Sequence, residues 1–287
     1  MTATSHTIAR DVISARGKDA RSFLHSQLSN DVASLAVGAS RYAFALEPTG
    51  KIAAFLRVHC VADDHFVLDV DAGCGDAALA RLNKFKIRVA CEFALESRTV
   101  VALRGLSAAE REKALTSTGT VSAWREGDGA VDVFDGDVAI GVSTGAADHV
   151  AANPESGVAT FEAERVRCAW PVFGVDITAD SLPAETGLVD VCVSFTKGCY
   201  PGQELVERMD SRGSTAPRRL MRLPSNAGAD AHVTTSAPIA GAPAVAGAPY
   251  RLGDGTSVGQ CTSVAGDFAL VMVQRAHFGV AEQLARS

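Results

Sequence analysis

The residues best suited to chemistry lie in one short run, Lys197-Gly198-Cys199-Tyr200-Pro201-Gly202-Gln203-Glu204. Two glycines and a proline within it disfavour a regular helix and let backbone N–H groups point outward. Cys199 lies between Lys197 and that open turn, where positive charge and free N–H groups favour the thiolate form. The run therefore predicts a loop that carries a functional thiol, with Lys197 tuning it and Gly198 and Gly202 shaping the backbone.

Arginines are concentrated after this run, at Arg208, Arg212, Arg218, Arg219 and Arg222. They form either a solvated face or a docking site for a polyanionic ligand, because guanidinium groups pair bidentately with carboxylate and phosphate. The whole chain has a net charge of −6 and a pI of about 5.6, which argues against broad nonspecific attachment to nucleic acid. Beyond Tyr200 no aromatic residues are interleaved with the arginines, so base stacking is not expected.

A second motif lies at residues 67–78, where a strand, a glycine turn and a helix start approximate G-x-G-x-x-A. Such loops bring backbone close to a dinucleotide or S-adenosylmethionine at a helix N-terminus. A third glycine is missing near Ala77, and the repeated βα units of a Rossmann domain are missing too. We interpret the motif as a plain strand-to-helix turn and keep a methyltransferase as a remote alternative.

Several elements must position these residues. Helical spacing predicts helices over residues 18–28, 78–85, 107–115 and 161–170. Strand patterns occur at residues 8–14, 41–46, 52–61, 65–70, 89–93, 98–103, 257–263 and 268–273, with short strands near Val131 and Val138. Strands and helices alternate irregularly, with hairpin-like pairs among them. This pattern predicts an α+β fold rather than a doubly wound parallel sheet.

The length of 287 residues predicts two domains, or three. The seven cysteines are odd in number and scattered, and the N-terminus has no apolar segment of a signal peptide, so we expect reduced thiols and a cytoplasmic protein. No Cys or His pairs have zinc-finger spacing, so no metal site is expected. The longest apolar stretch has six residues, 268–273, far short of the roughly 20 needed to cross a bilayer.

The motifs together resemble the YgfZ proteins, which are folate-binding relatives of the glycine-cleavage T-protein (aminomethyltransferase). Lys197 to Glu204 followed by Arg-x(3)-Arg-Gly resembles the family signature. Five further stretches resemble family motifs in the same order: the Phe23-Leu24 helix with Asn30-Asp31-Val32, the turn Glu47-Pro48-Thr49-Gly50-Lys51-Ile52, Pro171 to Asp176, Leu182 to Glu185, and Gly259 to Ser263.

The resemblance implies a fold in which subdomains surround a central folate cavity and a small C-terminal β barrel closes it. We expect residues 1–216 to form the folate-binding region, as two subdomains with a break near 104–110, and residues 217–287 to form the barrel. Glu185 matches the glutamate that contacts the pterin. A carboxylate suits this role because it accepts two parallel hydrogen bonds, although a helix N-terminal charge after Pro183 is the alternative. Further folate contacts are expected at Arg212, Gly198, Tyr200, Gly202 and Gln203.

One departure from the T-proteins concerns the reaction itself. Ala54 and Phe55 stand where aminomethyltransferases carry acidic residues, and neither side chain can transfer a proton. T-proteins also lack the cysteine of Lys-Gly-Cys-Tyr. The resemblance therefore implies a tetrahydrofolate-binding protein that supports iron–sulfur cluster assembly or repair in client enzymes, and through them tRNA modification. Classical turnover is not expected. The enzymatic alternative is a folate-dependent aminomethyl or one-carbon transferase.

Overall fold

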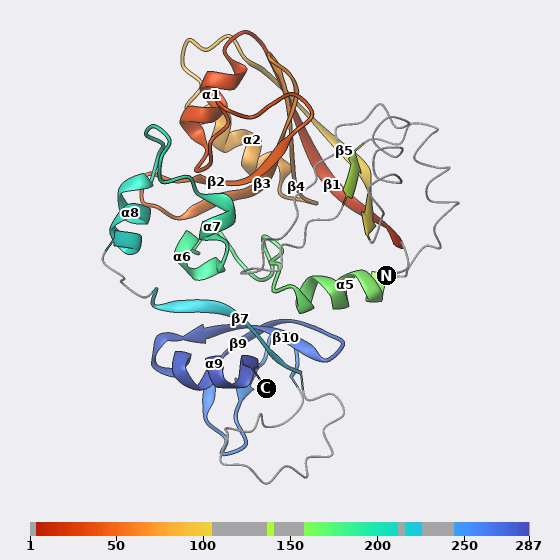
Figure 1. Ribbon diagram of the computed structural model, residues 1–287, viewed down its shortest axis with the longest axis vertical. Helices are drawn as coiled ribbons and strands as arrows, with labels where there is room; N and C mark the ends of the chain where they lie inside the picture. The colour runs from red at the N-terminus through yellow and green to blue at the C-terminus, as the bar shows by residue number, and fades with distance from the viewer. Residues whose placement is uncertain (1–3, 105–136, 141–157, 212–215, 226–243, 287) are drawn as a thin grey trace.

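The computed structural model describes residues 4–104, 137–140, 158–211, 216–225 and 244–286. Two antiparallel sheets, one large and one small, are joined by a layer of short helices (Figure 1). The predicted α+β class is therefore confirmed. The predicted helix at 107–115, the strand near Val131 and nearly all of the break near 104–110 lie outside the described residues.

The first sheet has six strands in the order β2-β3-β4-β1-β5-β6. Their bounds are β1 Thr4–Arg16, β2 Ser40–Leu46, β3 Ile52–Ala62, β4 His65–Asp71, β5 Glu92–Arg104 and β6 Asp137–Ile140. The central strands are apolar along most of their length because both faces of the sheet are covered, so strand β3 is almost wholly buried. The two strands predicted at 89–93 and 98–103 are one continuous strand, β5, which pairs with β1 along its whole length.

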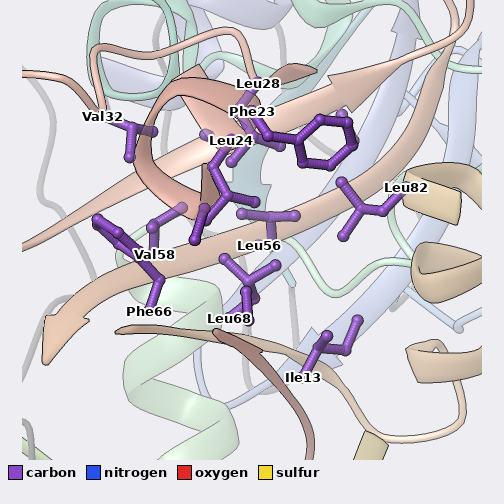
Figure 2. Close-up of a cluster of buried hydrophobic side chains, with 14 of the residues drawn as sticks. Ile13, Phe23, Leu24, Leu28, Val32, Leu56, Val58, Phe66, Leu68 and Leu82 are labelled. Carbon is purple, nitrogen blue, oxygen red and sulfur yellow. The ribbon is translucent and has the colours of Figure 1, made fainter. Parts of the chain in front are cut away.

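Helices α1 (Ala20–Gln27) and α2 (Gly75–Lys84) cover one face of this sheet. Helix α1 buries Ala20, Phe23 and Leu24, whose spacing places them on one side of a helix. Below them lie side chains from β1, β3 and β4, and Figure 2 shows how the two layers interlock. This core fixes the end of α1, against which the cysteine loop is held.

The opposite face of the sheet is covered by the helical layer and by the second sheet. The layer contains α5 (Val158–Arg167), α6 (Pro183–Thr186), α7 (Val189–Cys192) and α8 (Gln203–Ser211). Its apolar cluster joins Phe44 of β2, Val191 of α7 and Leu270 of β10. This cluster is therefore a core that the two sheets share.

The second sheet has four strands in the order β7-β10-β9-β8. Their bounds are β7 Arg218–Pro224, β8 Pro249–Arg251, β9 Ser257–Ala265 and β10 Phe268–Gln274. A short 3-10 turn, η1 (Arg275–His277), leads into helix α9 (Phe278–Arg286), which packs on this sheet. The predicted strands at 257–263 and 268–273 are confirmed, but a closed C-terminal barrel is not confirmed by the strands that are described.

Candidate functional site

Hydrogen bonds join the segment before the cysteine loop to the residues that follow α1. Ser194 N donates to Ser29 O at 2.9 Å, and Ser29 Oγ donates to Cys192 O at 2.6 Å. Asn30 Nδ2 donates to Val191 O at 2.9 Å. Residues 191–194 therefore run beside residues 29–30, and the cysteine loop begins at the C-terminal end of α1.

Lys197 fastens the loop itself. Its Nζ donates to His25 O at 2.5 Å and to Leu28 O at 2.8 Å, and it lies 4.7 Å from the centre of the Tyr200 ring. Burial lowers the pKa of Lys197 to about 8. The ammonium group thus satisfies carbonyls at the end of α1, where a positive charge is favourable.

The thiol itself is on the surface. Cys199 and Gly198 are exposed, whereas Tyr200 is buried in the core shared by the two sheets. Burial raises the pKa of Tyr200 to about 12. Cys199 therefore lies on a two-residue tip between two anchors, Lys197 on one side and the Tyr200 ring on the other.

The end of the loop meets the turn at residues 47–50. Gly202 has a φ of +82°, and a Cβ there would lie 2.7 Å from Glu47 O. Gln203 Oε1 accepts from Tyr200 N at 3.2 Å, just where α8 begins. Two motifs that are about 150 residues apart in the sequence thus come into contact, and only glycine fits between them.

Glu185 lies on α6, and its side chain is 3% exposed. Its Oε2 accepts from the backbone N of Leu182 at 3.1 Å, as in a capping box, and its Oε1 accepts from Arg218 Nε at 3.1 Å. The carboxylate is therefore both a helix-capping group and one half of an ion pair between α6 and β7.

The arginines that the structure describes are engaged by separate partners. Each of the four that are described has a different partner: Arg208 pairs with Glu204, Arg218 with Glu185, Arg219 with Glu282, and Arg222 donates to the carbonyl of Arg167. Arg212 lies outside the described residues. This arrangement favours the reading of separate solvated or paired side chains over a polyanion-docking surface.

A buried ionic cluster on the first sheet was not recognised from the sequence. Asp69 accepts from Arg57 Nε at 2.9 Å and from Arg10 Nε at 2.9 Å, and Nε2 of His59 lies 2.8 Å from it. Burial opposes ionisation of Asp69, but Arg57 and Arg10 outweigh it and hold the pKa of this carboxyl well below its usual range. Burial, with Arg57, lowers the pKa of His59 to about 4. The signal was the spacing of two, Arg57 with His59 and Asp69 with Asp71, inside apolar strands.

Ala54 and Phe55 occupy the positions where the resemblance to T-proteins implies acidic residues, and aromatic rings surround Phe55. Phe55 lies 5.6 Å from Trp170 and 5.7 Å from Tyr42 between ring centres. Ala54 points to the opposite core, beneath α1 and α2. The described residues therefore place no proton-transferring group at either of the two positions.

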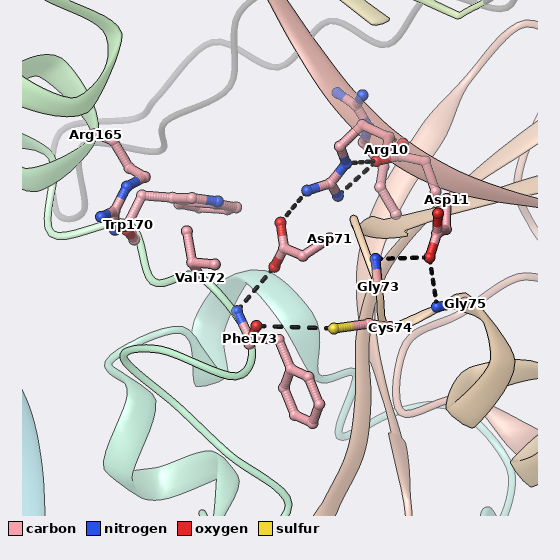
Figure 3. A network of polar contacts seen from close by, with 12 residues as sticks. Arg10, Asp11, Asp71, Gly73, Cys74, Gly75, Arg165, Trp170, Val172 and Phe173 are labelled. Carbon is pink, nitrogen blue, oxygen red and sulfur yellow. Dashed lines mark hydrogen bonds and ion pairs between the residues drawn. The ribbon is translucent and has the colours of Figure 1, made fainter. Parts of the chain in front are cut away.

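The glycine turn at residues 73–75 already holds an anionic group of the chain itself. Asp11 Oδ2 accepts from Gly73 N at 2.8 Å and from Gly75 N at 2.9 Å (Figure 3). On the other side, Asp71 pairs with Arg10 and accepts from Phe173 N at 2.8 Å. Because Asp11 occupies the amides that a phosphate or carboxylate would use, the interpretation as a structural turn is favoured over a cofactor loop.

A cavity of about 300 Å³ lies between α6, α8, β7 and α9. Pro183, Met209 and Phe278 are among its lining residues, and none of the predicted site residues that the structure describes lines it. Within the described ranges, no group of three or more His, Cys, Asp or Glu side chains could hold a metal ion. None of the helices that are described is long and apolar enough to span a membrane.

A family model and several known proteins are similar to this chain. The model described as the GCVT N-terminal domain matches residues 10–124. A protein named tRNA-modifying protein YgfZ, from Vibrio vulnificus, is 26% identical over 238 residues, covering 78% of this chain and 70% of that protein. An aminomethyltransferase from Lysinibacillus sphaericus is 33% identical over 104 residues, covering 36% of this chain and 28% of that protein.

The similarity extends to three dimensions. The crystal structure of glycine cleavage system aminomethyltransferase T from Bartonella henselae matches with a TM-score of 0.70 and 23% identity, covering 96% of this chain and 80% of that one. The resemblance inferred from the motifs is thereby confirmed. The chain is similar to YgfZ and aminomethyltransferase proteins and has the aminomethyltransferase fold.

Proposed function

We propose that the protein binds a reduced folate, with Glu185 holding the pterin, and that it supports iron–sulfur cluster assembly or repair in client enzymes through Cys199. The support is the similarity to a YgfZ protein over most of the chain and the shared aminomethyltransferase fold. The name of the YgfZ relative refers to tRNA modification. In this chain that link would run through client enzymes that carry clusters.

The observation that carries the folate proposal is the buried carboxylate of Glu185. Burying a carboxylate is costly unless it serves as an acceptor, and this one has two oxygens with different partners. The 2-amino group and the neighbouring ring N–H of a pterin form a planar donor pair that matches a carboxylate. The contacts proposed for Arg212, Gly198, Tyr200, Gly202 and Gln203 complete this site, in a cavity formed by residues 1–216 and closed by residues 217–287.

Aminomethyl transfer is the second candidate, and the site argues against it. A general acid or base must lie within hydrogen-bond reach of the reacting group. Phe55 is held among aromatic rings and Ala54 is buried under the helices on the other side of the sheet. We therefore assign no turnover of the T-protein type to this protein. Formation of methylene-tetrahydrofolate from an aminomethyl-lipoyl donor by the purified protein would restore that candidate.

Calorimetric titration of tetrahydrofolate and its 5-formyl derivative tests folate binding. We expect micromolar binding by the wild type and a loss of about 10- to 100-fold in Glu185→Gln, because a hydrogen bond to a charged group contributes about 1.5–3 kcal/mol. Glu282→Gln is the matched control, since Glu282 pairs with Arg219, which follows Arg218, the partner of Glu185, on strand β7. No binding of either folate by the wild type would refute the proposal.

Complementation of a cluster-dependent enzyme activity tests the thiol. Cys199→Ala should keep the wild-type fold and folate affinity, because the side chain is exposed, and should lose the activity. Cys74→Ala, which removes a partly exposed thiol on another element, should complement fully. Full complementation by Cys199→Ala would remove the thiol from the mechanism.

A further inference from the structure

The carboxylate proposed to bind the pterin is not available to an incoming ligand. Each oxygen of Glu185 has a partner at 3.1 Å, Arg218 Nε on Oε1 and Leu182 N on Oε2. With the side chain only 3% exposed, no face of the carboxylate is open to solvent. Because the carboxylate is buried, a planar donor pair can face both oxygens only after a group that now covers them moves.

The two partners differ in how easily they leave. The Leu182 amide belongs to the same helical turn as Glu185, and Glu185 N in turn donates to Leu182 O at 2.9 Å. Arg218 comes from a different element, since it is the first residue of strand β7, and its side chain is 35% exposed. A long side chain that reaches solvent can move, whereas the Leu182 amide is fixed in its helical turn, so Arg218 is the partner that a ligand would displace.

We propose that Arg218 is a built-in competitor of the ligand: it occupies the carboxylate of Glu185 until a reduced folate displaces it. This inference rests on the proposed function. The guanidinium supplies the positive partner that a buried carboxylate requires when no ligand is present. Ligand binding exchanges that partner for the 2-amino and ring N–H donors of the pterin, so the ion pair lowers the observed affinity by the fraction of molecules in which it is open.

The position of Arg218 gives the exchange a structural consequence. The pair joins α6, in the layer between the sheets, to β7, the edge strand of the second sheet. Releasing Arg218 removes one of the contacts between that strand and the rest of the protein. Ligand binding and the attachment of β7 are therefore opposed, and each weakens the other to the same extent.

Calorimetric titration of tetrahydrofolate into Arg218→Met and Arg219→Met tests the inference. Methionine keeps an apolar stem of similar length and removes the charge. We expect Arg218→Met to bind on the order of tenfold more tightly than the wild type, which corresponds to a pair that is open in about a tenth of the molecules. Arg219→Met is the matched control, since its guanidinium pairs with Glu282 and lies 4.6 Å above the Phe278 ring. Its affinity should stay within about twofold of the wild type.

The outcomes separate this inference from the proposed function. Wild-type affinity in Arg218→Met, or weaker binding that would make Arg218 a ligand contact, overturns the inference and leaves folate binding intact. Absence of binding in the wild type and in Arg218→Met alike refutes both. If Arg218→Met does not fold, Arg218→Lys replaces it. Lysine keeps the charge but loses the planar fork, so the affinity of Arg218→Lys for tetrahydrofolate should lie between that of the wild type and the tenfold higher value expected when the ion pair is absent. In the double variant Arg218→Met with Glu185→Gln, the gain should disappear.

Discussion

Removal of the Asp176 carboxylate should lower the stability of the protein substantially. The carboxylate is fully buried and accepts four hydrogen bonds. Oδ2 accepts from Arg165 Nη1 at 2.8 Å and from Val172 N at 2.9 Å, and Oδ1 accepts from Thr262 Oγ1 at 2.5 Å and from Ser263 Oγ at 2.7 Å. These donors come from α5, from the segment after it and from β9, so one carboxylate joins the second sheet to the helical layer.

The magnitude follows from what the donors lose. Breaking a buried ion pair by removing one partner costs about 3–5 kcal/mol. Asp176→Ala should fall near the lower end, about 3 kcal/mol, because Arg165 keeps its contact with Glu162 at 2.7 Å. For a chain of 287 residues that corresponds to a decrease in Tm of roughly 5 °C. Asp176→Asn should cost about half as much, since the two hydroxyls can rotate to accept from the new amide.

Thermal and urea unfolding, followed by circular dichroism, measure this effect. Asp180→Ala is the control, because Asp180 is an exposed carboxylate paired with Lys51, and its Tm should match that of the wild type. If the free energy of unfolding of Asp176→Ala lies within about 1 kcal/mol of the wild-type value, the four contacts do not hold the second sheet in place and the prediction is wrong.

Three further predictions concern the sheet, the loop and the thiol. The pKa of His59 is lowered from 6.5 to about 4, so between these pH values the imidazole is protonated in the unfolded state but neutral in the folded state. The free energy of unfolding should therefore be highest above pH 6.5 and fall by roughly 3 kcal/mol as the pH is lowered to 4. The pH profile of His59→Gln should be flatter. Gly202→Ala should cost about 1–3 kcal/mol from its positive φ and its contact with Glu47 O, whereas Gly198→Ala, with nothing within 4 Å, should be close to neutral in the same urea titration. Brief alkylation of the native protein followed by mass spectrometry should label Cys199 first, and a buried cysteine labelled equally fast would contradict the fold around it.

The sequence predicts most of the first sheet because its signals are local. Turn residues at 47–50 and apolar strands on either side of them give the β2–β3 hairpin nearly to the residue. The sequence does not predict helix α8, because two glycines and a proline directly precede its start at Gln203. The sequence predicts two short strands where the structure has β5, because pairing with β1, which keeps the strand continuous, is not visible in the local pattern.

The site was predictable in its residue types but not in its contacts. Cys199 and Lys197 are close in sequence, yet Lys197 Nζ donates to the carbonyls of His25 and Leu28, which lie near the N-terminus. The pairing of Glu185 with Arg218 is equally non-local, because it depends on how β7 meets α6. A linear pattern gives charges and spacing, but which charges meet is decided by tertiary packing.

The apolar core shared by the two sheets has a consequence for how the chain acquires its structure during synthesis. Leu270 and Met272 of β10 pack in the same cluster as Phe44 and Ile52, which the ribosome delivers more than 200 residues earlier. The side of the sheet that contains Phe44 and Ile52 is therefore not fully covered until β10 has been synthesised. The nascent protein exposes an unfinished apolar face for most of its translation, which makes it a natural client for chaperones that shield such surfaces.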